Sequence, residues 1–141
     1  MHRVFVYDTL KRGFPNHDAA MTAFRCLGRF RTVEAYPLVV GGKWFSVYLI
    51  DELGKGKPVF GEIFEVDDEG LGTLDRVEGT HLPNGYHRIT IALASNDGGS
   101  TFEAYTYAKR RDNIEGIHSE PLDEYTLDRR HVVPADRTSA F

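Results

Sequence analysis

Residues 67–78 (DDEGLGTLDRVE) constrain the fold most, because they predict a short amphipathic helix with a defined start and end. Asp67 or Asp68 can cap the first turn, where acidic side chains also favour the positive end of the helix dipole. Gly79 follows directly and can end the helix in a left-handed conformation. The chain is therefore expected to turn sharply at Gly79.

The apolar stripe of this helix contains a carboxylate. Leu71, Leu74 and Glu78 stand at i, i+3 and i+7, which places them on one face of a helix with about 3.6 residues per turn. Burial raises the pKa of a carboxyl group toward the range that suits acid–base catalysis. Two interpretations stay open: Glu78 is a functional acid, or it is a rim residue paired with Arg76 or Arg88.

Most of the remaining regular structure is expected to be strand. Period-two alternation and short apolar runs predict strands, while residues 96–100 (NDGGS) predict a hairpin turn. A short helix is expected at 17–24. The expected strands cover residues 3–7, parts of 28–40, 44–50, 59–66, 86–93 and 102–107. The pattern is that of a mixed α+β chain.

The chain length of 141 residues fits a single domain, 1–141, which can bury roughly 68% of its unfolded surface. From residue 109 onward the sequence is polar and has no clear period. We expect residues 109–141 to form an irregular C-terminal tail, packed through Tyr125 and Val132-Val133.

Composition excludes several classes of protein. The net charge of -4 argues against a nucleic-acid partner, and no apolar run is long enough to span a membrane. Cys26 is the single cysteine, so an internal disulfide is excluded. Because the N-terminus also lacks a signal-peptide pattern, we expect a cytoplasmic protein.

Other catalytic chemistries find little support. His81 and His87 flank a loop near Glu78, which leaves a base or metal role open, but no histidine has zinc-ligand spacing. Cys26 is more typical of a small core residue than of a nucleophile. What remains is one well-placed acid and a polar loop after the first strand, whose free N–H groups can hold an anion.

Several short motifs follow one another in order along the chain. They are residues 4–13 (VFVYDTLKRG), 15–17 (PNH), 36–39 (YPLV), 61–66 (GEIFEV), Leu74-Asp75-x-x-Glu78, Tyr86-x-Arg88 and Tyr105-x-Tyr107. Together these motifs resemble the gamma-glutamylcyclotransferase-like family, and its gamma-glutamylamine cyclotransferase branch in particular. The resemblance extends to about residue 107 and fades in the tail.

The resemblance implies an α+β fold, a small mixed β-barrel with flanking helices, in a monomer or weak dimer. It implies cleavage of a small-molecule gamma-glutamyl amide, with release of 5-oxoproline and a free amine or amino acid. Because the substrate's own α-amine is the nucleophile, neither a metal nor an organic cofactor is expected.

The resemblance also implies the site residues. Glu78 matches the catalytic acid, and the loop of Tyr7, Asp8, Thr9 and Leu10 matches the segment whose backbone amides hold the glutamyl group. The remaining candidates for substrate binding are three strand aromatics, Tyr86, Tyr105 and Tyr107.

Asp8 departs from the family pattern, which has glycine at this position. Glycine permits a positive φ and the close approach of a ligand. Aspartate adds bulk and a negative charge near the substrate's α-carboxylate. This departure leaves an alternative function open: a non-catalytic module on the same fold that binds a metabolite or a partner.

Overall fold

The computed structural model describes residues 1–8, 24–95, 97–126, 128 and 130–132. The helix expected at 17–24 lies outside these residues, except for Phe24. The strands are β1 (His2–Val6), β2 (Arg25–Thr32), β3 (Leu38–Gly41), β4 (Ser46–Leu49), β5 (Phe60–Val66), β6 (His87–Ser95) and β7 (Thr101–Ala108). The helices are α2 (Asp68–Glu78) and the 3₁₀ turn η1 (Arg111–Asn113).

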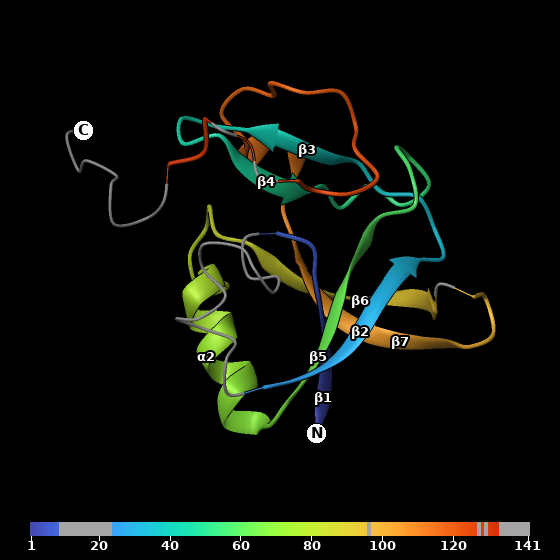
Figure 1. Ribbon diagram of the computed structural model, residues 1–141. Helices are drawn as coiled ribbons and strands as arrows, with labels where there is room; N and C mark the ends of the chain where they lie inside the picture. The colour runs from blue at the N-terminus through green and yellow to red at the C-terminus, as the bar shows by residue number, and fades with distance from the viewer. Residues whose placement is uncertain (9–23, 96, 127, 129, 133–141) are drawn as a thin grey trace.

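Five strands close into a barrel in the order β1-β5-β2-β6-β7 (Figure 1). The neighbours pair antiparallel, except where β1 meets β7 in parallel at Val4 and Tyr105. Gly61 on β5 allows close packing, since a Cβ there would lie 2.5 Å from the Val6 carbonyl oxygen and 2.7 Å from the Phe5 ring. The predicted α+β barrel is confirmed.

The small antiparallel sheet of β3 and β4 lies beyond one end of the barrel (Figure 1). Residues 109–126, expected as part of an irregular tail, run along this sheet. Isolated bridges join Ile50 to Lys109, Gly41 to Ile117 and Leu38 to Leu122. Tyr125 is fully buried.

Helix α2 has the predicted start and end. The Asp67 side chain accepts a hydrogen bond from the Gly70 N–H at 2.7 Å, and Gly79 ends the helix with φ 70°. Leu71 and Leu74 are buried, as the stripe predicted. In the described part of the chain, no helix is long and apolar enough to cross a membrane.

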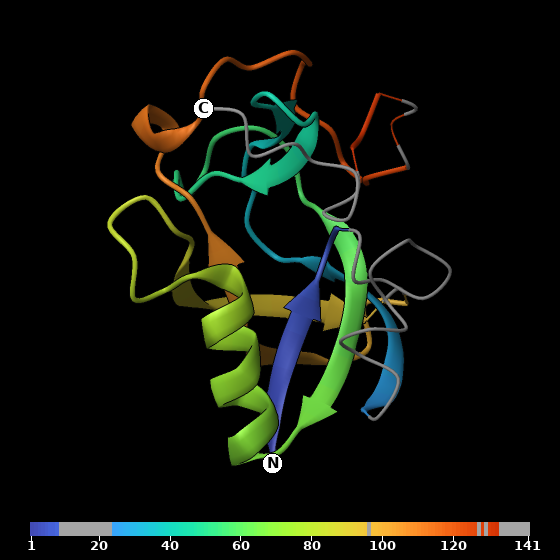
Figure 2. The same cartoon turned by 90° about the vertical axis from the view of Figure 1, so that its left-hand side faces the viewer.

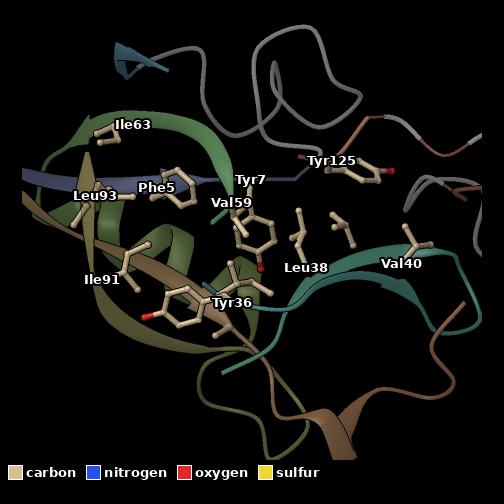
Figure 3. Packing of buried hydrophobic residues seen from close by; sticks show 14 residues of the cluster. Phe5, Tyr7, Tyr36, Leu38, Val40, Val59, Ile63, Ile91, Leu93 and Tyr125 are labelled. Carbon is tan, nitrogen blue, oxygen red and sulfur yellow. The ribbon is translucent and has the colours of Figure 1, made fainter. Parts of the chain in front are cut away.

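Alternation along β1 separates two apolar clusters. Phe5 and Tyr7 point into the inner core, which continues to the β3–β4 sheet and includes Leu38 (Figure 3). Val4 and Val6 point outward and pack under helix α2. The inner core fixes the barrel, and the outer cluster fixes the helix that carries Glu78.

Candidate active site

The end of β1 and the C-terminal end of α2 both lie on the side of the barrel that faces the β3–β4 sheet (Figure 2). This follows from the topology, because β5 runs antiparallel to β1 and α2 returns beside both strands. Asp8 follows β1 after Tyr7, and Glu78 is the last residue of α2. Two segments about seventy residues apart in the sequence thereby place two carboxylates at one site.

A small cavity of about 10 Å³ lies between β1 and α2. Leu74 and Val6 contribute apolar walls, and Asp8 and Glu78 contribute the acidic groups. Tyr107 closes the side toward β7. A cavity of this size has room for about one water molecule.

Glu78 is half-buried and its acidity is strongly altered. Burial raises the pKa of its carboxyl group from 4.5 to about 8, and the negative charge of Asp8 acts in the same direction. The Lys109 ammonium opposes both effects. A carboxyl group with this pKa can both accept and donate a proton near neutral pH.

A larger, open groove of about 430 Å³ begins at Glu78 and runs past the end of α2. Val77, Leu82 and Pro83 form apolar parts of its wall. Tyr86 and Lys109 lie at the same groove. Glu78 therefore borders both the small cavity and the groove.

Backbone contacts fix the loop that walls the groove. Gly79 adopts the left-handed conformation at the helix end, and the Tyr86 N–H donates to the Glu78 carbonyl at 3.0 Å. A Cβ on Gly85 would lie 1.8 Å from the Gly79 carbonyl oxygen, so a side chain at Gly85 would push the loop apart.

Lys109 lies over two aromatic rings. Its Nζ is 5.0 Å from the ring centroid of Tyr48 and 5.1 Å from that of Tyr86. The two rings stack with centroids 5.8 Å apart, and the Tyr86 hydroxyl donates to the Val47 carbonyl at 3.3 Å. Burial lowers the pKa of Lys109, while Glu78 raises it. These ring contacts favour a defined position for the cation.

Asp75 stands nearly one turn before Glu78 and ties α2 to the barrel. Its carboxylate accepts the Tyr107 hydroxyl at 2.7 Å and the Arg88 Nη1 at 2.7 Å. Arg76 instead donates to Thr73 at 3.1 Å. Arg76 and Arg88, the two arginines considered as rim partners of Glu78, thus make these other contacts. We call the group of Asp75, Tyr107 and Arg88 the Asp75 clamp.

The structure brings together Tyr7, Asp8, Glu78 and Tyr107 at the cavity, and Tyr86 at the groove. Thr9 and Leu10 lie outside the described residues. The Tyr7 hydroxyl donates to the Tyr107 carbonyl at 2.6 Å and is buried, so its side chain serves the core.

Three residues considered in the sequence analysis have environments that the sequence did not indicate. Tyr105 lines a separate hollow with His2 and Arg3, away from Glu78. Asp8 needs no left-handed backbone: among described residues other than glycine, positive φ occurs at Phe45 only. His87 pairs with Asp51 at 2.9 Å.

Lys109 and Tyr48 were not among the residues singled out from the sequence. Lys109 continues the alternation of Tyr105 and Tyr107, and that spacing was a usable signal for a residue on the same side of the strand. Tyr48 gave no such signal, because its approach to Tyr86 depends on how the β3–β4 sheet meets the barrel.

The fold and the geometry place one half-buried acid between a cavity and a groove on a small barrel, an arrangement that suits general acid–base chemistry. Residues 4–127 match the model of the family described as "Gamma-glutamyl cyclotransferase, AIG2-like". The chain belongs to this family.

Individual relatives agree. The chain is 37% identical over 134 residues to the gamma-glutamylaminecyclotransferase of Bos taurus, covering 91% of this chain and 77% of that protein. It is 34% identical over 138 residues to gamma-glutamylaminecyclotransferase B of Danio rerio, covering 93% of this chain and 71% of that protein. The crystal structure of an AIG2-like protein from Mus musculus superposes with a TM-score of 0.68 at 37% identity, covering 77% of each chain.

Proposed function

We propose that this protein is a cyclotransferase that cleaves a gamma-glutamyl amide and releases 5-oxoproline and a free amine or amino acid. The observation that carries the proposal is Glu78, a half-buried acid with a pKa of about 8 between the cavity and the open groove. Family membership and the names of the relatives support the same activity.

The reaction requires proton transfer and positioning. Glu78 accepts a proton from the α-ammonium group of the substrate, and the free amine attacks the γ-carbonyl carbon to form a new C–N bond. Glu78 then donates the proton to the leaving nitrogen as the original C–N bond breaks. The ring nitrogen loses its second proton, which departs with the amine as an ammonium ion and leaves Glu78 ionised again. Holding amine and carbonyl in reactive geometry corresponds to effective molarities of ~10⁵ M or more. Proton transfer contributes roughly 10²–10⁴-fold.

We assign the glutamyl group to the end of β1 and the leaving amine to the groove. Backbone N–H groups of the loop from Tyr7 through Asp8 and Thr9 to Leu10 would hold the α-carboxylate or the developing oxyanion. Tyr107 and Tyr86 would form walls on either side of Glu78. The mechanism assigns no step to a metal or an organic cofactor, because the substrate supplies its own nucleophile.

We also propose that the protein works in the cytoplasm as a monomer or weak dimer. Cys26 is free and half-buried, and a chain without a disulfide suits a reducing compartment. The proposed substrate is a small molecule that the groove can accept without a second protein.

The test is a product assay. Purified protein is incubated with several gamma-glutamyl amides, and 5-oxoproline and free amine are quantified together. The proposal predicts equal amounts of 5-oxoproline and free amine, since each cleavage releases one molecule of both, whereas hydrolysis would release glutamate in place of 5-oxoproline. Saturable binding of these compounds without 5-oxoproline would instead identify a binding module on the same fold.

A further inference from the structure

The last turn of α2 carries Glu78 but has no buried apolar side chain of its own. The apolar side chains that this helix buries are Leu71 and Leu74, which come before the last turn, and Val77 is 61% exposed. A helix end that does not pack against the core opens more readily than the middle of a helix. The position of Glu78 therefore depends on what else holds residues 75–78.

Asp75 ties this turn to the barrel. Its carboxylate accepts the Tyr107 hydroxyl from β7 and the Arg88 guanidinium from β6, both at 2.7 Å. The Asp75 and Arg88 side chains are 28% and 32% exposed, so water screens the ion pair only in part. The Asp75 carbonyl oxygen also accepts from Thr80, from its N–H at 3.0 Å and from its hydroxyl at 3.2 Å. Asp75 thus joins the turn to two strands and to the loop that follows.

Tyr107 connects the Asp75 clamp to the small cavity. It lines this cavity together with Glu78, and its hydroxyl donates to Asp75. Burial and the Asp75 carboxylate raise the pKa of Tyr107, so the phenol keeps its proton and stays a donor. Asp75 and Glu78 stand at i and i+3, which makes them neighbours on the helix surface. Contacts that fix Asp75 therefore also fix Glu78 beside the cavity.

We infer, on the basis of the proposed function, that Asp75 is a positioning residue, which keeps Glu78 within reach of the reacting atoms. It does so through its contacts with Tyr107 and Arg88, and the Tyr107 hydroxyl serves Asp75 and not the substrate. Because proton transfer requires the acid at hydrogen-bond distance, a displacement of about 1 Å costs up to about 10²-fold in rate. Three motifs of the sequence meet in this group: Leu74-Asp75-x-x-Glu78, Tyr86-x-Arg88 and Tyr105-x-Tyr107.

The acidity of Glu78 reports its position. Its titratable and charged neighbours come from every element around it: Tyr7 and Asp8 at the end of β1, Tyr86 before β6, Tyr107 on β7, Lys109 after β7, and Asp75 on α2 itself. Burial is the largest cause of the raised pKa of Glu78. If the last turn of α2 moves outward, water reaches the carboxyl group, and its pKa falls toward 4.5.

Tyr107→Phe tests the inference without changing any charge. It keeps the ring and removes the hydrogen bond to Asp75. We expect kcat on a gamma-glutamyl amide to fall about tenfold or more while KM changes by less than about twofold, because the variant leaves the groove and the end of β1 in place. The acid limb of the pH profile of kcat/KM should move to lower pH. Titration of the Glu78 carboxyl group by NMR should show the same shift in the protein without substrate.

A second variant and a control complete the test. Asp75→Asn keeps the size and weakens both contacts, so it should lower kcat in the same way. Because Asp75 and Tyr107 act through one hydrogen bond, the double variant should lose about as much as the more severe single variant. Arg76→Ala, at the next and exposed position of the same helix, should leave kcat and the Glu78 titration unchanged. If Asp75→Asn fails to fold, Tyr107→Phe and the titration still decide.

Three results would overturn the inference. In the first, Tyr107→Phe leaves both kcat and the pKa of Glu78 unchanged. In the second, its loss appears in KM alone, which would assign the hydroxyl to substrate binding. In the third, the free-energy losses of the two variants add, which would mean that the residues act separately. If the wild type forms no 5-oxoproline, the proposed function fails, and the NMR titration alone decides whether the Asp75 clamp positions Glu78.

Discussion

Glu78 should make the folded chain less stable as pH rises. Its pKa is about 8 in the folded state and near 4.5 when exposed. Below about pH 4.5 both states hold the proton, so Glu78 has no effect. Between the two pKa values the unfolded chain has released the proton and the folded chain keeps it, so the free energy of unfolding falls until about pH 8.

Glu78→Gln removes this titration. We expect the wild type to lose about 2–4 kcal/mol more stability than the variant between about pH 5 and about pH 8. Urea unfolding at a series of pH values measures it. Parallel plots of unfolding free energy against pH for the two proteins would mean that folding does not disfavour the ionised form of Glu78.

Asp8 is expected to control the pH dependence of catalysis through its charge. Burial and, to a lesser extent, the Asp8 carboxylate raise the pKa of Glu78 to about 8, so at neutral pH only a minority of the protein holds Glu78 as the base. Asp8→Asn keeps the size and removes the charge. The acid limb of the pH profile of kcat/KM should therefore move to lower pH.

Comparing Asp8→Gly with Asp8→Asn separates the effect of side-chain size from the effect of charge, because both variants remove the charge and only glycine removes the bulk. If bulk also restricts the loop, the glycine variant should gain more activity on gamma-glutamyl amides than the asparagine variant. Kinetics of the three proteins at matched salt decide this. An acid limb that stays in place in both variants would show that Asp8 has no electrostatic effect on Glu78.

At the scale of elements, the Asp75 clamp should set where α2 holds Glu78. Tyr107→Phe removes the hydrogen bond to Asp75 but keeps the ring, and it should lower the free energy of unfolding by about 1–2 kcal/mol. Arg76→Ala, on an exposed arginine of the same helix, should change it by about 0.5 kcal/mol or less. Thermal and urea unfolding measure both, and equal small losses would argue against the clamp.

The helix and its acid were predictable because their signals are local. The stripe of Leu71, Leu74 and Glu78 with its two caps depends only on neighbouring residues, and the structure has the same helix. The strands of the hairpin were predictable for the same reason. The meeting of Tyr7–Asp8 with Glu78 required the family resemblance, since nothing local joins β1 to α2.

Alternation after Tyr107 indicates which side of the strand Lys109 lies on, but its position in the groove could not be derived from local signals. It depends on the parallel bridge to Ile50 and on the approach of Tyr48 to Tyr86, both of which are tertiary. Residues 109–126 were also hard to predict, because isolated bridges leave no periodicity in the sequence. The groove beside Glu78 is thus a product of the whole fold.

For the whole molecule, we expect Tyr125 to contribute strongly to stability. Its side chain is fully buried in the inner core with Leu38 and Val40, as Figure 3 shows. Tyr125→Ala should cost about 3–5 kcal/mol, and Tyr125→Phe, which removes the hydroxyl that accepts a hydrogen bond from the Asp128 N–H, about 1 kcal/mol. Leu53→Ala, at an exposed position, serves as the control in urea unfolding. If Tyr125→Ala lowers the free energy of unfolding by less than about 1 kcal/mol, residues 109–126 do not contribute to the core as described.

The central claim is that Glu78 transfers the proton in 5-oxoproline formation. The most direct measurement is kcat for Glu78→Gln on a gamma-glutamyl amide that the wild type turns over, with Glu69→Gln, an exposed acid of the same helix, as the matched control. We predict a loss of at least ~10²-fold for Glu78→Gln with the fold intact, and near-normal turnover for Glu69→Gln. Near-normal turnover by a folded Glu78→Gln protein would contradict the account.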